Sequence, residues 1–328
     1  MIGINGLGRI GRLLVRRLAS TRLERLRAIN DPGDLETLIH LLRRDTVHGP
    51  CPLQVAGLRE GDQDFLLFNG QRVPLFHEAD PSRIPFGSVG VRLVVESSGR
   101  FTRREDAARH VRGAVSHVVI SAPSPDADFT VIAPINGMAL DLDRHRIISN
   151  ASCTAHATAP MLQVLEEAFG IDGIGMSTVH VATNDQRLVD APHKDIRRAR
   201  AAFRSIIPTT SSAFGALQRV QPWLPHSPAG ASPWGFSGFA LRVPLLNVNL
   251  VDVTATLRQD ADAEAVNQVF RDAANSQRWQ GLLALAHEGA VSCDFTGRSE
   301  SIVMDLDLTR SLGKHFVKIF GWHDNETG

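Results

Sequence analysis

Residues 1–18 read MIGINGLGRIGRLLVRRL, and this stretch decides the fold. A short apolar run from Met1 to Gly6 leads into the glycine pattern GxGxxG over residues 6–11, and leucines at helical spacing follow it. A second apolar run, Arg27 to Asp31, ends at Pro32. Strand, glycine turn, helix and strand form a βαβ unit, and such units build parallel sheets. The sequence therefore predicts an α/β, Rossmann-type doubly wound domain.

The three glycines of this turn have separate tasks in a dinucleotide-binding fold. Gly6 permits the tight turn, Gly8 lets a pyrophosphate approach the backbone, and Gly11 lets the helix pack closely on the strand. The pattern also occurs where glycines serve packing alone, but here a strand precedes it and a helix follows. Asp31 lies about 20 positions further on, where an acidic residue accepts from a ribose hydroxyl. Its charge repels a 2′-phosphate, so the sequence favours NAD over NADP.

Composition and charge exclude several classes of protein. The chain has 328 residues, enough for about two domains, and its 35 basic residues balance 35 acidic ones. Nucleic-acid binders carry a basic excess, so no such partner is expected. Three cysteines fit a reducing compartment better than a disulfide framework. No signal peptide or bilayer-spanning run is present in the sequence, so we expect a cytoplasmic protein without a membrane partner.

The pattern of the sequence changes near Asn150. A helix is expected over Thr158–Phe169, with Pro160 in its first turn. The β-rich segments that follow, at 175–181, 238–243, 248–257 and 316–322, predict an α+β catalytic domain with a mostly antiparallel sheet. We expect an NAD-binding domain over 1–150, a catalytic domain over 151–315, and a return of 316–328 to the first domain. The long segment 183–237 is expected to be functional or partner-facing, with a surface insertion at 225–238.

Cys153 and His180 are the candidate catalytic pair. Cys153 follows Ser149-Asn150-Ala151-Ser152 near the start of the predicted helix, where the helix dipole stabilises a thiolate and lowers the pKa of the thiol. His180 ends a predicted strand that could bring an imidazole to that thiol. A free cysteine is more often a small buried hydrophobe, and a random histidine is more often a surface or core residue. Residue type and spacing alone leave these alternatives open.

Seven motifs in sequence order carry a resemblance to a known family. They are Gly3–Gly6, Ser149–Thr154, Thr178–His180, Asp190–Asp195, Ile206–Pro208, Arg242–Pro244 and Trp322–Gly328. Together these motifs resemble the phosphorylating glyceraldehyde-3-phosphate dehydrogenase family, including its erythrose-4-phosphate dehydrogenase and arsenical-linked relatives. The resemblance implies a homotetramer that acts in glycolysis and uses no metal.

The resemblance implies a covalent mechanism. Cys153 attacks a phosphorylated aldehyde, His180 acts as its base, hydride passes to NAD, and inorganic phosphate releases an acyl phosphate from the thioester. Further positions match family residues that hold the attacking phosphate (Ser152, Thr154, Ser211 and Ser212), the phosphate of the substrate (Thr183 and Arg242), and the cofactor (Arg9, Ile10, Ser98, Ser121 and Asn325, besides the glycines and Asp31).

Departures from the family pattern keep alternatives open. Asp185 stands where the pattern expects a threonine, and a carboxylate there would repel a phosphate; Asp185-Gln186 resembles the erythrose-4-phosphate enzymes. Ser212 replaces a glycine, and the sequence stops at Gly328 where the family continues through another helix. The alternatives are therefore an erythrose-4-phosphate dehydrogenase and a catalytically weak binding or regulatory paralogue. The acyl acceptor is left open between phosphate, arsenate and water.

Overall fold

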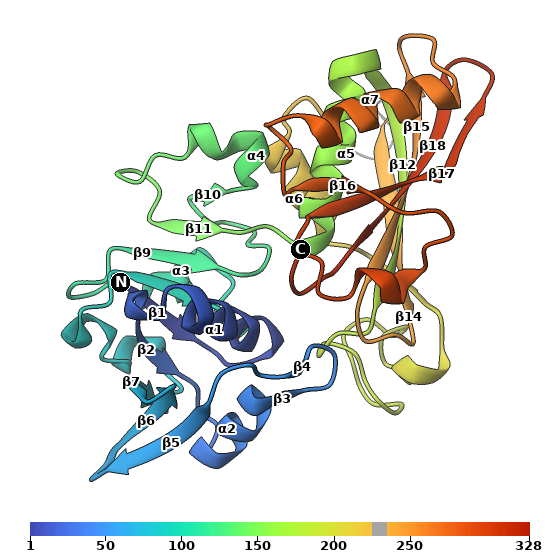
Figure 1. Ribbon diagram of the computed structural model, residues 1–328. Coiled ribbons are helices and arrows are strands. Elements are labelled where there is room, and N and C mark those ends of the chain that lie inside the picture. Colours follow the sequence, from blue (N-terminus) through green and yellow to red (C-terminus); the bar gives the residue numbers. More distant parts are fainter. Residues whose placement is uncertain (225–234) are drawn as a thin grey trace. The chain divides into compact units, whose positions relative to one another are not determined.

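The computed structural model describes residues 1–224 and 235–328 (Figure 1). The described chain forms two compact units, one of residues 1–131 and 138–151 and the other of residues 132–137 and 152–328. Most of the insertion expected at 225–238 lies outside the described residues.

The first unit is built on a nine-stranded sheet of order β10-β11-β9-β8-β1-β2-β7-β6-β5. The strands from β10 to β7 pair in parallel, as the βαβ unit predicted. The antiparallel extension β5-β6-β7 was not predicted. The strands are β1 (Ile2–Asn5), β2 (Leu26–Asn30), β5 (Val55–Glu60), β6 (Gln63–Phe68), β7 (Gln71–Phe76), β8 (Leu93–Glu96), β9 (His117–Ile120), β10 (Phe129–Thr130) and β11 (Ile147–Ser149).

Three α-helices and a small hairpin also belong to this unit: α1 (Arg9–Thr21), α2 (Leu35–Arg43), α3 (Arg104–Ala108), and β3 (Arg44–Asp45) with β4 (Gly49–Pro50). One apolar core joins β1, β2 and the extension to α1 and α2, and a second lies around β8 and β9. The predicted β1-turn-α1-β2 unit is confirmed, with β1 and β2 parallel.

The second unit contains a mixed sheet of order β13-β14-β12-β15-β18-β17-β16 within the described residues. Two of its neighbouring pairs, β12 with β14 and β16 with β17, are parallel, and the other pairs are antiparallel. Its strands are β12 (Ile171–Val181), β13 (Ile207–Thr209), β14 (Phe236–Val243), β15 (Asn249–Leu257), β16 (Leu283–Leu285), β17 (Ile302–Leu312) and β18 (Phe316–His323). The predicted Rossmann-type sheet and the mostly antiparallel second sheet are thus both confirmed.

Helix α5 (Cys153–Phe169) is the central helix of the second unit, and α6 (Ala213–Val220) and α7 (Ala263–Asn275) pack against it (Figure 1). A short helix, α4 (Ala133–Asn136), contacts it as well. Most of α5 is buried, and it touches β12, β15, β17 and β18. The start of α5 is therefore held firmly by the core of this unit.

Two sequence-based expectations are wrong. The segment expected to return to the first domain instead forms β18, which pairs along its whole length with β15 and also pairs with β17. Its alternating apolar residues, such as Val317 and Ile319, are needed in that core. The helix expected from Thr158 begins at Cys153, so Pro160 lies inside it. None of the helices in the described ranges has the length and apolarity to cross a bilayer.

Candidate active site

Cys153 is the first residue of α5, and the local sequence explains why the helix starts there. Ala151 adopts a left-handed backbone with φ of 52°, which turns the chain out of its extended path. Ser152 then serves as the N-cap, and its hydroxyl accepts a hydrogen bond from Ala155 N at 3.1 Å. This turn and cap fix the thiol at the helix start.

His180 comes from the end of β12, next to Arg242 of β14. The two residues are direct neighbours in the parallel pairing of these strands. His180 is buried, and its Nε2 lies 3.6 Å from Cys153 Sγ. The predicted pair of thiol and imidazole is thus brought together across 27 residues of sequence.

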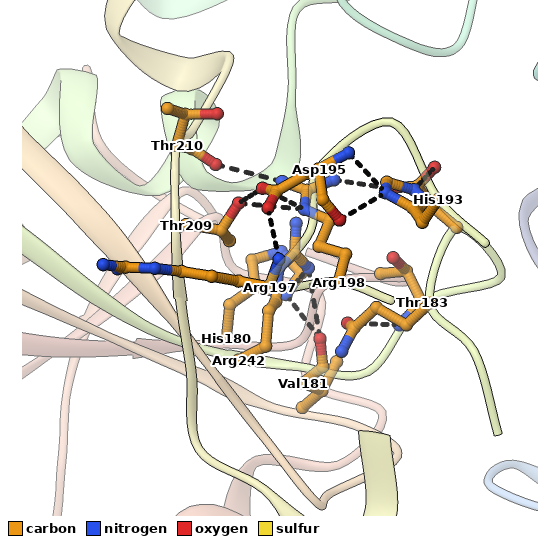
Figure 2. Close-up of polar contacts among 12 residues, drawn as sticks. His180, Val181, Thr183, His193, Asp195, Arg197, Arg198, Thr209, Thr210 and Arg242 are labelled. Atoms are coloured by element: carbon orange, nitrogen blue, oxygen red, sulfur yellow. Dashed lines mark hydrogen bonds and ion pairs between the residues drawn. The ribbon is translucent and has the colours of Figure 1, made fainter. Parts of the chain in front are cut away.

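Arg242 controls which nitrogen of His180 carries the ring proton. Its Nη1 lies 2.5 Å from His180 Nδ1, and a guanidinium can only donate, so Nδ1 accepts and Nε2 carries the proton toward the thiol (Figure 2). The Val181 carbonyl lies 2.8 Å from the same Nδ1. If Arg242 turns to an anion, Nδ1 can donate to that carbonyl, and Nε2 becomes free to accept the proton of Cys153.

The thiol does not have the lowered pKa expected from its helix position. Burial of Cys153 raises its pKa, and hydrogen bonds from Thr154 and the charge of Arg242 lower it only in part. The expected net lowering is therefore wrong for this arrangement, because desolvation of the thiolate outweighs the stabilising groups.

Changing Arg242 to Met should make the thiol harder to ionise. Because the positive charge of Arg242 lowers the pKa of Cys153, its loss should raise that pKa further, and the rate of alkylation by iodoacetamide should reach its plateau at higher pH. Alkylation is measured against pH by mass spectrometry of the Cys153 peptide. Arg200→Met is a matched control, since Arg200 pairs with Asp190 on the exposed surface. A profile that stays in place in Arg242→Met, or moves to lower pH, contradicts this account.

A polar pocket of about 300 Å³ opens beside the pair. Seven predicted site residues line it: Ser152, Cys153, Thr154, His180, Ser211, Ser212 and Arg242. Thr183 is not among the lining residues; its backbone N donates to Gln186 Oε1 at 3.2 Å. The structure thus gathers most of the residues predicted to bind phosphate and leaves Thr183 outside this pocket.

Five further lining residues were missed by the sequence analysis: His193, Lys194, Asp195, Arg198 and Thr210. Two of them, Lys194 and Arg198, are cations, and with Arg242 they give the pocket three positive side chains that suit a phosphorylated ligand. The available signal was the basic run that follows the Asp190–Asp195 motif. Arg198 of that run is largely buried and forms an ion pair with Asp185.

Asp185, which departs from the family pattern and was expected to repel a phosphate, is paired with positively charged or hydrogen-bonding neighbours. Its carboxylate forms an ion pair with Arg198 and lies 3.3 Å from His193 Nε2. Burial opposes ionisation of Asp185 most strongly, yet these two partners together hold its pKa below the usual value. The carboxylate therefore serves to hold Arg198 and does not act as a free negative charge.

Thr209 and Asp195 hold the other side of the Arg198 guanidinium. Arg198 Nε donates to Thr209 Oγ1 at 2.9 Å, and Thr209 donates to Asp195 Oδ2 at 2.6 Å (Figure 2). Arg198 Nη2 also donates to the Thr210 carbonyl at 3.1 Å. With so many partners, Arg198 has a fixed direction at the pocket wall.

The first unit carries the features of a dinucleotide cradle. Gly6 has φ of 96°, and a Cβ there would lie 2.5 Å from Ser98 N. A Cβ on Gly11 would lie 1.9 Å from the Gly6 carbonyl oxygen, so both positions require glycine. Gly8 caps α1 without a side chain, and a Cβ there would meet nothing closer than 4.0 Å. The first turn of α1, at Arg9 and Ile10, follows this glycine, and a helix N-terminus favours an anion such as a pyrophosphate.

The remaining predicted cofactor residues lie at the carboxyl ends of strands. Asp31 follows β2 and accepts from Leu7 N at 2.7 Å and Gly33 N at 2.8 Å. Ser98 follows β8, and its backbone N donates to the buried Glu96 at 2.8 Å. Ser121 follows β9, with its N bonded to the Glu96 carbonyl at 3.0 Å. In a parallel sheet these ends share one edge, the usual place for a ligand.

Asn325 belongs to the second unit, where its Oδ1 accepts from Val248 N at 3.1 Å. Across the parts of the chain that the structure describes, no group of three or more His, Cys, Asp or Glu side chains could hold a metal ion.

Comparison with known proteins identifies the family. The family model "Glyceraldehyde 3-phosphate dehydrogenase, NAD binding domain" matches residues 1–104, and "Glyceraldehyde 3-phosphate dehydrogenase, C-terminal domain" matches residues 152–325. The chain belongs to the glyceraldehyde-3-phosphate dehydrogenase family. It is therefore an NAD-dependent oxidoreductase, and the predicted family and cofactor are confirmed.

Curated relatives match this glyceraldehyde-3-phosphate dehydrogenase family member along its whole length. Identity is 41% over 327 residues with glyceraldehyde-3-phosphate dehydrogenase 1 of Bacillus cereus and 42% over 327 residues with the enzyme of Geobacillus stearothermophilus. It is 40% over 328 residues with the enzyme of Streptomyces coelicolor. Each alignment covers 100% of this chain and 94% of the relative.

Proposed function

We propose that this enzyme oxidises glyceraldehyde 3-phosphate to 1,3-bisphosphoglycerate, with NAD and inorganic phosphate, through a thioester on Cys153. The observation that carries the proposal is the contact of 3.6 Å between Cys153 Sγ and His180 Nε2, beside a pocket with three cationic side chains. The names of its relatives support the substrate. Asp185 suggested erythrose 4-phosphate as an alternative substrate. Because Arg198 balances the charge of Asp185, this residue does not disfavour glyceraldehyde 3-phosphate.

The first steps are carried by Cys153 and His180. Sγ bonds to the aldehyde carbon while His180 Nε2 takes the thiol proton, and the protonated His180 returns that proton to the carbonyl oxygen, which becomes the hydroxyl of a hemithioacetal. His180 then takes the proton of that hydroxyl while the carbon loses a hydride and becomes a thioester. NAD, when bound, supplies the acceptor for that hydride. The residues proposed to hold it are Gly6, Gly8, Gly11, Arg9, Ile10, Asp31, Ser98, Ser121 and Asn325.

The last step releases the acyl group. A phosphate oxygen attacks the thioester carbon, the bond from carbon to Sγ breaks, and the acyl phosphate leaves while Cys153 is restored as a thiolate. Ser152, Thr154, Ser211 and Ser212 are proposed to hold this phosphate. Arg242 and Thr183 are proposed to hold the phosphate of the substrate, with Arg198 as a further cation at the pocket wall.

Two broader features belong to the same proposal. We propose a homotetramer, supported by exposed apolar side chains in the long segment, where Leu188, Val189 and Ile196 are 71%, 73% and 83% exposed. Light scattering of the purified protein measures the oligomeric state directly.

We also propose a cytoplasmic location, supported by Cys51, Cys153 and Cys293, which are all free of disulfides.

Turnover assays test the proposed function. NADH formation is followed with NAD and either glyceraldehyde 3-phosphate or erythrose 4-phosphate, each with and without inorganic phosphate. The proposal predicts sustained turnover that requires phosphate and favours glyceraldehyde 3-phosphate. A preference for erythrose 4-phosphate contradicts the substrate, and equal turnover without phosphate contradicts the acyl acceptor. No turnover from folded protein supports the catalytically weak paralogue.

A further inference from the structure

His77, directly after β7, makes two contacts that tie the cofactor edge of the first sheet to its antiparallel extension. Its Nδ1 lies 3.0 Å from the backbone carbonyl oxygen of Asp31. Its Nε2 lies 3.1 Å from Oδ2 of Asp64, which is on β6. The imidazole therefore bridges the residue proposed to bind ribose and a buried carboxylate.

Asp64 is held in its ionised form. It is 4% exposed, and Arg59 of β5 donates to it through two hydrogen bonds of 2.6 and 2.8 Å. The hydrogen bond from Arg59 lowers the pKa of Asp64 most strongly, and His77 adds to this lowering against the effect of burial. An ionised carboxylate has no proton to donate, so Asp64 can only accept from His77.

Both partners of the His77 ring are therefore acceptors. A backbone carbonyl oxygen also cannot donate, so the two contacts form together only if both ring nitrogens carry a proton. That form is the imidazolium cation. A neutral ring carries one proton and can keep only one of the two hydrogen bonds.

The charged groups on the Nε2 side of His77 are Asp64 and its partner Arg59. Asp64 faces Nε2 from β6, and the Asp31 group that contacts the ring is its backbone carbonyl, which carries no net charge. Arg59 of β5 is the neighbouring cation. It forms an ion pair with Asp64 and also interacts electrostatically with Glu36 of α2.

The backbone of Asp31 is anchored to the end of β7 from both sides when His77 is protonated. Asp31 N donates to the Phe76 carbonyl at 3.0 Å, and the Asp31 carbonyl accepts from His77. These two bonds fix the peptide units that aim the Asp31 carboxylate at Leu7 N, beside the glycine turn. Loss of the second bond lets the carbonyl side of Asp31 rotate.

We propose that His77 is a positioning residue for NAD: its protonated form fixes Asp31, so the enzyme binds NAD more tightly when His77 is charged. This inference rests on the proposed role of Asp31 in holding the cofactor ribose. His77 belongs to the first unit, whereas Cys153 and the lining of the pocket beside it belong to the second. The effect is therefore on NAD affinity and not on the chemical steps.

The sign and size of the effect follow from the hydrogen bonds. Raising the pH removes the second proton of His77, one bond is lost, and the dissociation constant for NAD rises. The loss of one charge-assisted hydrogen bond at a half-exposed ring predicts an increase of about three- to tenfold.

The test is the dissociation constant for NAD, measured by calorimetry from about pH 5.5 to pH 8.5. The wild type should show the rise, and His77→Gln should show a constant value close to that of the wild type at high pH. His117→Gln is the matched control and should keep the rise, because His117 begins β9 at the opposite end of the strands from Asp31. Thermal unfolding of each variant confirms that it is folded.

Two outcomes overturn the proposal: a rise of the same size in His77→Gln, or a constant dissociation constant in the wild type. Asp31→Asn separates this failure from failure of the proposed cofactor site. If Asp31→Asn binds NAD as tightly as the wild type, the role of Asp31 is wrong whatever His77 does. If it binds more weakly while His77→Gln keeps the full pH dependence, only the inference about His77 fails.

Discussion

Replacing Cys153 by serine is expected to lower phosphate-dependent NADH formation by at least about 10⁴-fold, because a serine hydroxyl is a far weaker nucleophile than a thiolate. The hydroxyl can take the same place at the start of α5, so the cap by Ser152 and the helix should be kept. Steady-state turnover and the unfolding temperature are measured together. The unfolding temperature should change little while turnover is lost.

Cys293→Ser is the matched control for this prediction. Cys293 is exposed and makes only a weak contact with Asp294 at 3.9 Å, so its replacement should leave turnover unchanged. If Cys293→Ser loses activity, or if Cys153→Ser keeps a tenth or more of the wild-type rate, the thioester mechanism at Cys153 is wrong.

Replacing His180 by asparagine is expected to lower kcat by about 10²–10⁴-fold, the usual contribution of a positioned general base. Asparagine removes the nitrogen that lies 3.6 Å from Sγ and leaves the thiol without a group that can accept its proton. The raised pKa of Cys153 makes this help more important, since little thiolate forms without it. Activity of the variant should rise with pH further into the alkaline range than that of the wild type.

The pH profile of kcat measures this effect, with His287→Asn as control. His287 is exposed, and its Nε2 lies 3.9 Å from Asp294 in the second unit. A His180→Asn variant with the wild-type pH profile would show that His180 does not take the thiol proton.

Local sequence patterns were sufficient for the fold of the first unit near its glycine turn. Gly6 and Gly11 meet backbone atoms so closely that only glycine fits, and such constraints leave a clear trace in the sequence. The extension β5-β6-β7 was missed although Asn69-Gly70, a typical hairpin turn, stands between the six-residue strands β6 and β7. The segment containing β18 was misassigned because alternation predicts a strand but not the sheet that it joins.

The active-site residues that belong to sequence motifs were predictable. The roles that depend on tertiary contacts were not. Cys153 and His180 came from motifs, and the register of β12 with β14 explains why Arg242 joins them. The role of Asp185 depends on Arg198 and His193, which lie 13 and 8 residues away along the chain. No local pattern links those residues. The raised pKa of Cys153 is likewise a result of burial, which the helix position alone does not reveal.

The most direct test of the central claim is detection of the acyl-enzyme. The enzyme is mixed with NAD and glyceraldehyde 3-phosphate without inorganic phosphate, quenched in acid, and digested for mass spectrometry. The account predicts a phosphoglyceroyl adduct on the peptide that carries Cys153, and its loss when inorganic phosphate is added before the quench. An adduct on another residue, no adduct despite NADH formation, or an adduct that inorganic phosphate does not release would contradict the account.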